Sequence, residues 1–460
     1  MTVSEQLAAF AARTTRAVLP HAVVECLKLH LLDTLGVALA GVRLDFGSAA
    51  IAAGRELSSG GVANLSTVWG TNDQLPAPWA AFTNGTLAHG LDYDNTHQES
   101  VVHVSAGIVP AVLAAAEAGN SDGRALITAL AIGEEAAIRI GLAARGGFHD
   151  RGYHPTGVCN AFGAALAAGA LANLSPDALA NALGIAGSQA SGLMEFLTDG
   201  TWVKRIHGGW AAHAGLVAAV LARYGFTGPR AVLDGRFGFY RTHLGEGGWD
   251  LTAVTDGLGE RWHLLDTALK PYPCCHYNHA FIDAAAALRA AHALTPDAIE
   301  RIECHIHARQ VPVVCEPIAS KRAPQTDYDA KFSLPYAVTS LFVRGHVDVD
   351  DFTPEAIREP AVLALAERTY YVEDPTSDFP RRFGGRLRVH LRNGGVLDHH
   401  EPINRGSAER PLTHAEVEAK FRHNAARSLP AVQVDRVIEA VAMLDQVPTA
   451  GRLVAALRSS

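Results

Sequence analysis

Charge is scarce in this sequence and is not gathered into runs. Charged residues make up 19% of the 460 residues, the net charge is -8, and no run of Lys and Arg with interleaved aromatic residues occurs. A nucleic-acid-binding surface needs clustered positive charge, so nucleic acid is excluded as a main partner. The mild negative balance does not exclude an anionic small molecule, because a pocket can be locally basic.

Long apolar runs and a leader-like N-terminus are also lacking. The first 20 residues, MTVSEQLAAFAARTTRAVLP, contain an early acidic residue and no apolar core of the kind found in secretory signals. No run of about 18 apolar residues occurs, so no membrane span is expected. Six cysteines suit a compartment in which thiols stay reduced. We therefore predict a cytoplasmic protein with no membrane partner.

Several motifs that mark cofactor and hydrolase sites are missing. No G-x-G-x-x-G follows a predicted strand, and G-x-x-x-x-G-K-[ST], G-x-S-x-G and H-E-x-x-H do not occur. These absences argue against simple nicotinamide, nucleotide, serine-hydrolase and zincin sites. What remains is acid/base chemistry without a cofactor or a metal.

Apolar residues at helical spacing are abundant. Hydrophobic residues make up 48% of the chain, which is enough for a sizeable core. Alanine and glycine are so frequent that neighbouring helices must approach closely. Helical patterning continues to about residue 243. Helices are expected at 20–41, 76–88, 105–119, 122–145, 157–173, 176–187 and 200–225.

The pattern changes after Leu264. A loop feeds a helix that ends near residue 293, and alternation of apolar and charged residues predicts strands at 299–311 and 384–401. Asn393-Gly394 predicts a hairpin turn within the second of these segments. Further helices are expected at 331–345, 413–424 and 430–443.

This order predicts a mainly α protein with two domains. Residues 1–265 form a large all-helical domain, which the C-terminal helices at 406–460 complete. Residues 266–405 form a smaller α+β lid domain. A Gly/Ser-rich connection is expected at 58–73.

A short polar segment leads directly into the helix expected at 105–119. Its polar residues are Asp92, Asp94, Thr96, His97, Glu99 and His103. Two carboxylates, a hydroxyl and two imidazoles could bind a metal or transfer protons. A loop whose acids cap a helix is the simpler alternative. The position of His103 just before an apolar helix favours a functional site.

Two further segments carry polar groups beside apolar helices. Lys204 and His207 are three residues apart, so both share one helix face and need an anion nearby. A substrate carboxylate, Asp199 or another acid could supply it. The proline that follows His154 holds this imidazole on an extended corner at a helix N-terminus.

The loop at 270–279 gathers Lys270, Tyr272, Cys274, Cys275, His276 and His279. A zinc site would need a second Cys/His pair, and adjacent cysteines make poor tetrahedral partners. A pocket loop at the domain junction is favoured. Histidines elsewhere have simpler interpretations: His30 is expected to be structural, and His305, His307, His399 and His400 are expected on exposed strand faces or ends.

These motifs resemble those of the MmgE/PrpD family, which includes 2-methylcitrate dehydratase, cis-aconitate decarboxylase and iminodisuccinate epimerase. The matching text is GLDYDNTHQESVVHVSAG, GYHPTG, GTWVKRIHGGWAAHAG, KPYPCCHYNHAFIDAA and DAKFSLPYAV, in family order over nearly the whole chain. The resemblance implies a large helical domain, a smaller α+β lid, an active site between them, catalysis without a metal and a homodimer.

The resemblance also implies which residues form the pocket. They are Asp92, Thr96 and His103 in the polar segment, His154 in the H-P corner, Lys204 and His207 in T-x-x-K-x-x-H, and Lys270 in K-x-Y-P. We assign catalysis to His103, Asp92, Lys204 and His154, and substrate binding to Thr96, His207, Lys270, Cys275 and His276. In this scheme His103 transfers the proton, and Asp92 orients it or takes part itself.

Three positions depart from the family pattern. Asn95 stands where a second Asp is common, and Val104 follows His103 where proline is common. The decarboxylase branch carries a histidine where Cys275 stands, and His276 is one position later. We therefore expect a cofactor-free dehydratase of the 2-methylcitrate type, acting on a small polycarboxylate. Epimerisation or decarboxylation on the same site, and a non-catalytic protein that binds organic acids, are the alternatives.

Overall fold

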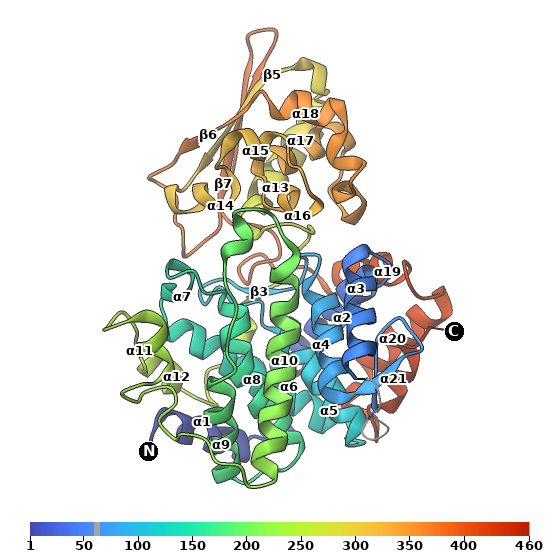
Figure 1. The fold of residues 1–460 in the computed structure, drawn as a ribbon. Helices are drawn as coiled ribbons and strands as arrows, with labels where there is room; N and C mark the ends of the chain where they lie inside the picture. Colours follow the sequence, from blue (N-terminus) through green and yellow to red (C-terminus); the bar gives the residue numbers. More distant parts are fainter. Residues whose placement is uncertain (59–64, 460) are drawn as a thin grey trace.

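The computed structural model describes residues 1–58 and 65–459, and the fold is mainly α (Figure 1). Helices pack around a central group in the larger, N-terminal part. The helices of this part are α1 (Val3–Arg13), α2 (His21–Gly41), α3 (Asp45–Leu57), α4 (Ala77–His89), α5 (Ser105–Ala118), α6 (Gly123–Ala143), α7 (Gly147–Asp150), α8 (Pro155–Leu171), α9 (Pro176–Gly187), α10 (Ile206–Arg223), α11 (Phe239–Leu244) and α12 (Thr252–Thr255).

Small residues let the central helices touch. Helix α10 packs between α4 and α8 (Figure 1). A Cβ atom added at Gly209 would lie 2.2 Å from the carbonyl oxygen of Phe82, and one added at Gly85 would lie 2.6 Å from the Cα of Gly209. Only glycine permits this α4–α10 approach, so the abundance of small residues has the packing consequence expected from the sequence.

The smaller part is built on one mixed sheet, which is drawn at the top of Figure 1. The strand order is β6-β5-β7-β8, with β5 parallel to β6 and antiparallel to β7. Helices α13 and α17 pack together, and α13 covers β7 and β8. The elements are α13 (His279–His292), β5 (Ile299–Ile306), α14 (Val311–Val314), α15 (Ile318–Arg322), α16 (Asp327–Lys331), α17 (Leu334–Arg344), α18 (Pro360–Ala366), β6 (Thr369–Glu373), β7 (Gly385–Leu391) and β8 (Val396–Glu401).

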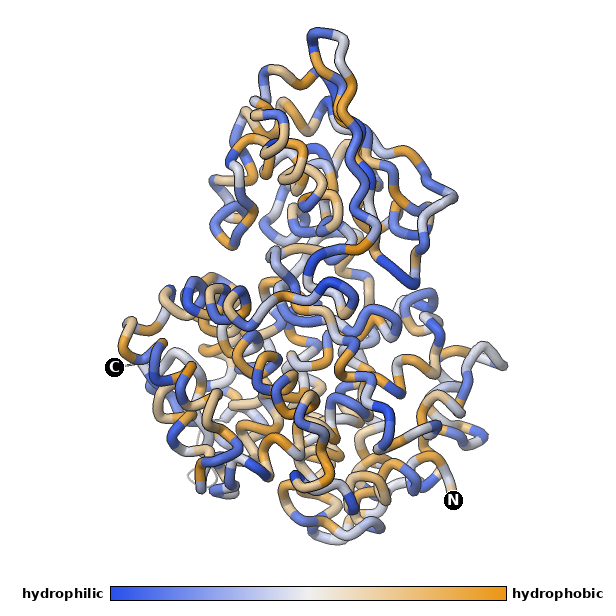
Figure 2. Tube along the Cα trace, turned by 180° about the vertical axis from the view of Figure 1, so that it is seen from behind, coloured by the Kyte–Doolittle hydropathy of each residue, from blue (hydrophilic) through white to orange (hydrophobic). Residues whose placement is uncertain are grey.

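The chain then returns to the helical part. Helices α19 (His414–Ala425), α20 (Ala431–Ala442) and α21 (Gly451–Ala456) follow the sheet, and α19 packs on α2. The side chains that they bury join the large hydrophobic cluster of the N-terminal helices, whereas the sheet and its helices form a second cluster. Hydrophobic stretches run through both parts (Figure 2). We propose the domains 1–265 with 406–460, and 266–405, on this basis.

Most predicted elements are present with small shifts at their ends, and α9 begins at Pro176 after the Ser175 cap as expected. The helical pattern predicted to continue to 243 is wrong between α10 and α11, where the chain forms turns. Strand β6 was not expected. In the connection at 58–73, residues 59–64 lie outside the described residues, and β1 (Leu65–Thr67) pairs with β2 (Gln74–Pro76).

One short sheet joins the two parts of the chain. Strand β3 (Thr96–His97) lies in the polar segment and pairs antiparallel with β4 (Thr267–Ala268), just before the loop that carries Lys270. This pairing brings two segments that are far apart in sequence to one place. Across the described residues, no helix combines the length and the apolar character that crossing a membrane requires.

Candidate active site

The polar segment is held in a fixed shape between α4 and α5. Asp92 adopts a left-handed backbone conformation with φ of 53°, which Asp tolerates better than most residues. The backbone N–H of His103 donates to Thr156 Oγ1 at 3.0 Å, and its carbonyl accepts from Asn160 Nδ2 at 3.0 Å. Helix α8 therefore positions His103 through its backbone.

Two lysines converge on the Asp92 carboxylate. Lys204 forms an ion pair with Asp92 Oδ1, and Lys270 Nζ lies 3.0 Å from Asp92 Oδ2 and 2.9 Å from the Asp92 carbonyl oxygen. All three residues are buried. Burial would raise the pKa of Asp92, but Lys204 and Lys270 outweigh it and hold the pKa well below its usual range. The anion that Lys204 needs is therefore Asp92 rather than Asp199.

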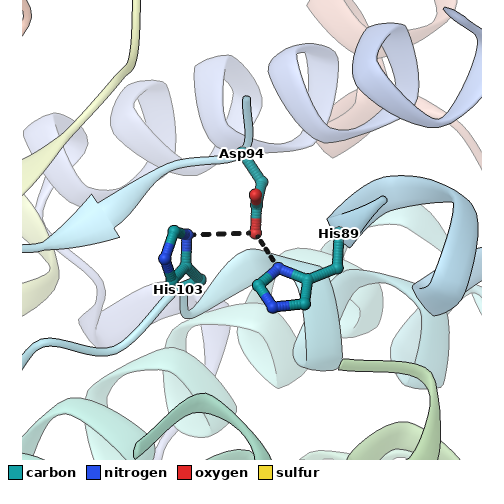
Figure 3. Close-up of side chains that lie close together, drawn as sticks. All are labelled: His89, Asp94 and His103. Carbon is teal, nitrogen blue, oxygen red and sulfur yellow. Dashed lines mark hydrogen bonds and ion pairs between the residues drawn. The ribbon is translucent and has the colours of Figure 1, made fainter. Parts of the chain in front are cut away.

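Asp94, two residues later, faces imidazoles instead of lysines. Its Oδ2 lies 2.8 Å from His89 Nδ1 and 3.3 Å from His103 Nδ1, and Figure 3 shows both rings directed at this oxygen. The nearest Asp92 oxygen lies 4.0 Å from His103 Nε2. Asp94 therefore occupies the orienting position beside His103 that the sequence assigned to Asp92. Thr96 Oγ1 is 3.3 Å from the same His103 nitrogen.

The surroundings of His103 favour its neutral form. Burial lowers its pKa to about 4, Lys270 and Lys204 act in the same direction, and Asp94 opposes them. A bound anion would offset the lysine charges and raise this pKa. The protonation of His103 is thus sensitive to whatever occupies the space beside the two lysines.

Two further imidazoles lie behind His103. The His154 ring stacks on that of His89 with centroids 5.4 Å apart, and His154 Nδ1 is 3.0 Å from His207 Nδ1. Burial is the main cause that lowers the pKa of His207 to about 3 and that of His154 well below its usual range. Lys204 and His207 thus bond different partners, and Lys204 lies in a 3-10 turn before α10 begins.

The loop after β4 brings Cys275 and His276 to the same region. Asn404 Oδ1 accepts from Gln98 at 3.2 Å, which leaves its amide nitrogen to donate to His276 Nε2 at 2.7 Å. His276 Nδ1 then carries the proton, and this nitrogen has no protein partner among the described residues. Burial raises the pKa of the Cys275 thiol to about 11, so the thiol is protonated.

Lys420, on α19, braces both loops from behind. Its Nζ donates to the carbonyl oxygens of Tyr93 at 3.0 Å and Lys270 at 2.9 Å, and it pairs with Asp33 on α2 at 2.6 Å. The ammonium also lies 3.7 Å from the centroid of the Tyr93 ring. One buried cation therefore fixes the segments that carry Asp92 and Lys270 relative to α2.

These segments meet at one cavity, which encloses about 70 Å³ that water can reach. Of the residues assigned from the sequence, all but His207 line it, and His207 supports His154 from outside. Those that line it are Asp92, Thr96, His103, His154, Lys204, Lys270, Cys275 and His276. The sequence did not predict roles for Asn404 and Lys420, because their contacts come from segments distant in sequence. The pairing of His89 with Asp94 was also missed, because His89 is the last residue of an apolar helix.

His30 has the structural role expected, since it is buried and bonds Glu134 at 2.8 Å. His399 lies 2.9 Å from Glu401 on β8 at the edge of the sheet. The expectation of an exposed strand face for His305 and His307 is wrong. His305 is half-buried on β5, and His307 lies beyond the end of the strand, where it caps a 3-10 turn.

Among the described residues, the possible ion-binding group beside the cavity is His89, Asp94 and His103. In this arrangement both rings already bond the Asp94 carboxylate.

Two family models together match most of the chain. Residues 5–252 match the MmgE/PrpD N-terminal domain, and residues 272–446 match the MmgE/PrpD C-terminal domain. The two matched regions supply the two sides of the cavity, with Asp92, His103 and Lys204 in the first and Cys275 and His276 in the second.

Curated relatives span most of the chain. It is 28% identical to the cis-aconitate decarboxylase-like protein oryM of Aspergillus oryzae, over 95% of this chain and 93% of the relative. It is 30% identical to the cis-aconitate decarboxylase of Homo sapiens, over 92% of this chain and 88% of the relative. A mitochondrial 2-methylcitrate dehydratase of Yarrowia lipolytica matches 27% of the chain at 29% identity, over 25% of the relative. The chain therefore belongs to the MmgE/PrpD family and is an enzyme of the lyase type.

Proposed function

We propose that this enzyme decarboxylates an unsaturated tricarboxylate of the cis-aconitate type. The observation that carries the proposal is the convergence of two lysines and three imidazoles, His103, His154 and His276, on one buried cavity. The names of the relatives that span most of the chain support it. His276, one position after the place expected for the decarboxylase histidine, lines the cavity with a ring nitrogen free to donate.

The reaction needs fixed positive charge where negative charge grows. The carbon–carbon bond to one carboxylate breaks, CO₂ leaves, and the electron pair moves through the neighbouring double bond toward a second carboxylate. Lys204 and Lys270 lie where they can stabilise that charge, and because they are held by Asp92 they need not reorganise. Such chemistry needs no metal or cofactor, and we propose that the enzyme uses none.

A proton must then reach the carbon skeleton. Substrate binding brings negative charge to the lysines that keep His103 neutral, so His103 takes up a proton together with the substrate. His103 delivers this proton to carbon, and Asp94 holds the imidazole in position throughout. The imidazole is then neutral again, and it takes up its next proton from solvent when the next substrate binds.

Dehydration of a 2-methylcitrate-type acid is the second candidate. It is favoured by the lowered pKa of His103, since an imidazole with a pKa of about 4 is neutral and free to accept a proton from carbon. The matching dehydratase relative covers only 27% of the chain, which is why we place this reaction second.

Turnover of four acids separates the candidates. Purified enzyme is incubated with cis-aconitate, citrate, 2-methylcitrate and iminodisuccinate, with and without a chelator. Release of CO₂ from cis-aconitate, unchanged by the chelator, is expected. An unsaturated product absorbing in the near ultraviolet from citrate or 2-methylcitrate would favour dehydration, and a change in optical rotation of iminodisuccinate would favour epimerisation.

A matched pair of variants tests the loop. His276→Ala is expected to lower CO₂ release by about 10²-fold or more, since a positioned acid/base group contributes that much. Cys274→Ala, on the same loop but not in the cavity lining, is expected to keep most activity. The reverse ranking would contradict the assignment of His276.

We also propose that the enzyme is a homodimer formed through α10, which lies at the front of Figure 1. Ile206 is 38% exposed, Val220 41% and Tyr224 80%. One face of α10 carries a stripe of exposed and half-buried residues. Successive members of this stripe are alternately four and three residues apart, as in a coiled-coil seam, and the order of these intervals is the same from either end. An antiparallel second copy would therefore meet matching residues. The stripe is Ile206, Trp210, His213, Val217, Val220 and Tyr224.

Sedimentation analysis tests this contact. Val220→Glu combined with Tyr224→Asp is expected to give a monomer. Val432→Glu, on the exposed face of α20, is expected to leave the dimer intact. A dimer that survives the α10 variant would contradict this surface.

A cytoplasmic location is proposed on separate grounds. All six cysteines are free thiols, and five of them are buried in hydrophobic clusters, namely Cys159, Cys274, Cys275, Cys304 and Cys315. Such thiols fit a reducing compartment.

A further inference from the structure

Across the described residues, three groups of side chains have donor atoms close enough to hold one ion. In the group beside the cavity, the Asp94 carboxylate already bonds both imidazoles. In a second group both carboxylates already accept backbone N–H groups, and its members are His346, Asp348 and Asp351. In the third group, within the part of the chain that the structure describes, the side chains are not bonded to one another. Its members are His97, His263 and Asp266.

The side chains of this third group are spaced for one shared ion. A ring nitrogen of each histidine and a carboxylate oxygen of Asp266 lie within 4.8 Å of one another. Ligand atoms that bind zinc at about 2.1 Å in a tetrahedral arrangement are about 3.4 Å apart. No two of the atoms therefore need to approach by more than about 1.4 Å. Rotation of an exposed side chain such as Asp266 can supply this movement.

His97 is held in place by Ser100, three residues later. The His97 side chain is buried, and its Nδ1 lies 3.0 Å from Ser100 Oγ and 3.3 Å from the backbone nitrogen of Ser100. These contacts leave Nε2 for an ion. With an ion on Nε2, Nδ1 carries the hydrogen and donates to Ser100 Oγ, which is the kind of outer bond that metal-binding histidines usually make.

The other two members lie on one 3-10 turn, His263–Asp266, which helix α6 fixes in place. Glu135 accepts from the backbone N–H of His263 at 3.1 Å, and Arg139 donates to the carbonyl oxygen of Arg261 at 2.8 Å. Directly after this turn the chain enters β4, which pairs with the strand that carries His97. The backbone therefore brings His97 beside the turn without help from an ion.

The charges of the group suit a cation. Burial is the main cause that lowers the pKa of His97 to about 3 and that of His263 to about 4, so both imidazoles are neutral, as metal ligands must be. Asp266 supplies a carboxylate. Arg261 opposes a cation, but this residue is exposed and its side chain can turn into solvent.

We propose that His97, His263 and Asp266 bind one zinc ion, with water in the fourth position. Two imidazoles and a carboxylate form a ligand set that zinc favours. None of the three side chains lines the cavity, so the ion takes no part in the proposed catalysis. It ties β3 to the turn before β4, and thus stabilises the short sheet that joins the two parts of the chain.

Zinc binding and thermal unfolding test the proposal. The whole enzyme is treated with a chelator, dialysed and titrated with zinc chloride in a calorimeter, and one zinc ion per chain is expected. At a zinc concentration about 100 times the Kd, the Tm should rise by about 3–5 °C. Release of CO₂ at about 25 °C should be the same with and without zinc. No zinc uptake, or an unchanged Tm, would overturn the proposal, and a loss of turnover on zinc removal would contradict the purely structural role.

X-ray absorption at the zinc edge identifies the ligand atoms. Nitrogen and oxygen at about 2.0–2.1 Å are expected, without sulfur. Sulfur in the zinc shell would instead place the ion at Cys274 and Cys275, and would overturn the assignment.

Matched variants locate the ion. Asp266→Ala and His263→Ala are expected to weaken zinc binding by about 10-fold or more, and Ser100→Ala by about 10–100-fold, because His97 loses its outer bond. His346→Ala, in the second group, should bind zinc as the wild type does. Because Asp266 is exposed, its variant should fold normally. Wild-type affinity in both Asp266→Ala and His263→Ala would overturn the site.

Discussion

Asp92 and Asp94 are two residues apart, both buried and both ionised, yet they serve different surroundings. Asp92 is held by two lysine ammonium groups, while Asp94 is held by two imidazoles, the type of side chain best suited to proton transfer. The difference shows how one short segment can separate the charge that stabilises a reacting anion from the group that moves a proton. Removing one group at a time tests whether this division is real.

The largest effect on turnover is expected from removing His103, which is paired with Asp94. His103→Ala should lower kcat by about 10²–10⁴-fold, because it removes the proposed proton donor. Folding should be intact, as judged by circular dichroism and thermal unfolding. His399→Ala on β8 serves as the control and should retain full activity. Turnover near the wild-type rate in His103→Ala would contradict the role given to this residue.

Removing one of the two lysines that hold Asp92 should mainly lower the stability of the fold. Lys204→Met leaves a buried Asp92 with one lysine instead of two, and the free energy of unfolding should fall by about 3–5 kcal/mol. Urea denaturation measures the loss. The double variant Asp92→Asn/Lys204→Met removes both charges of the pair and should recover much of it. Equal losses in the single and double variants would show that the charge pair is not the cause.

A smaller effect on kcat is expected from Asp94→Asn, which changes the surroundings of His103. The amide keeps the shape of Asp94 but removes the charge that raises the pKa of His103. Because His103 must be protonated to donate, the alkaline limb of the pH profile of kcat should move to lower pH. We expect kcat to fall by about 10–10²-fold with little change in KM, because His103 loses only its positioning group. A change in KM alone would instead indicate that Asp94 contributes to substrate binding.

A further effect is a pH dependence of stability that the imidazoles create. The pKa is about 4 for His103 and about 3 for His207 in the folded enzyme, against about 6.5 in the unfolded chain. The unfolded state therefore binds more protons below pH 6.5, and stability falls as pH falls. Each histidine should contribute about 1.4 kcal/mol per pH unit between pH 6.5 and its folded pKa.

Urea midpoints at pH 7, 6 and 5 measure this dependence. The double variant His103→Gln/His207→Gln should show a shallower loss between pH 7 and 5 than the wild type. Equal stability of the wild type at pH 5 and pH 7 would contradict the lowered pKa values.

The sequence was informative wherever the signal is local. Helix α9 follows from a Ser-Pro start and a 3.6-residue period, and the β7–β8 hairpin follows from Asn393-Gly394, where Gly394 has φ of 86°. Strand β6 was missed because only Thr369 of its five residues is buried, so it lacks the alternation that marks a half-buried strand. The turns after α10 were missed because short apolar runs there imitate a helix.

The candidate site was predictable as a set of residues, but not as a set of contacts. Composition placed two acids and two imidazoles in one segment, but only the left-handed Asp92 backbone and the position of α8 decide which acid meets which base. His89 ends α4 and reads as part of an apolar helix. Asn404 meets the site across a separation in sequence of 128 residues from His276, which no local pattern encodes.

Because Lys420 lies near the C-terminal end of the chain, the site can be completed only late in synthesis. The Lys420 ammonium bonds both the segment that carries Asp92 and the loop that carries Lys270. It comes from α19, which follows the sheet in the sequence. A nascent chain that has not yet emerged past residue 420 has every side chain that lines the cavity, but it lacks the brace that keeps those loops in register. The enzyme should thus gain activity late, when its C-terminal helices dock, and incomplete chains should be inert toward cellular tricarboxylates.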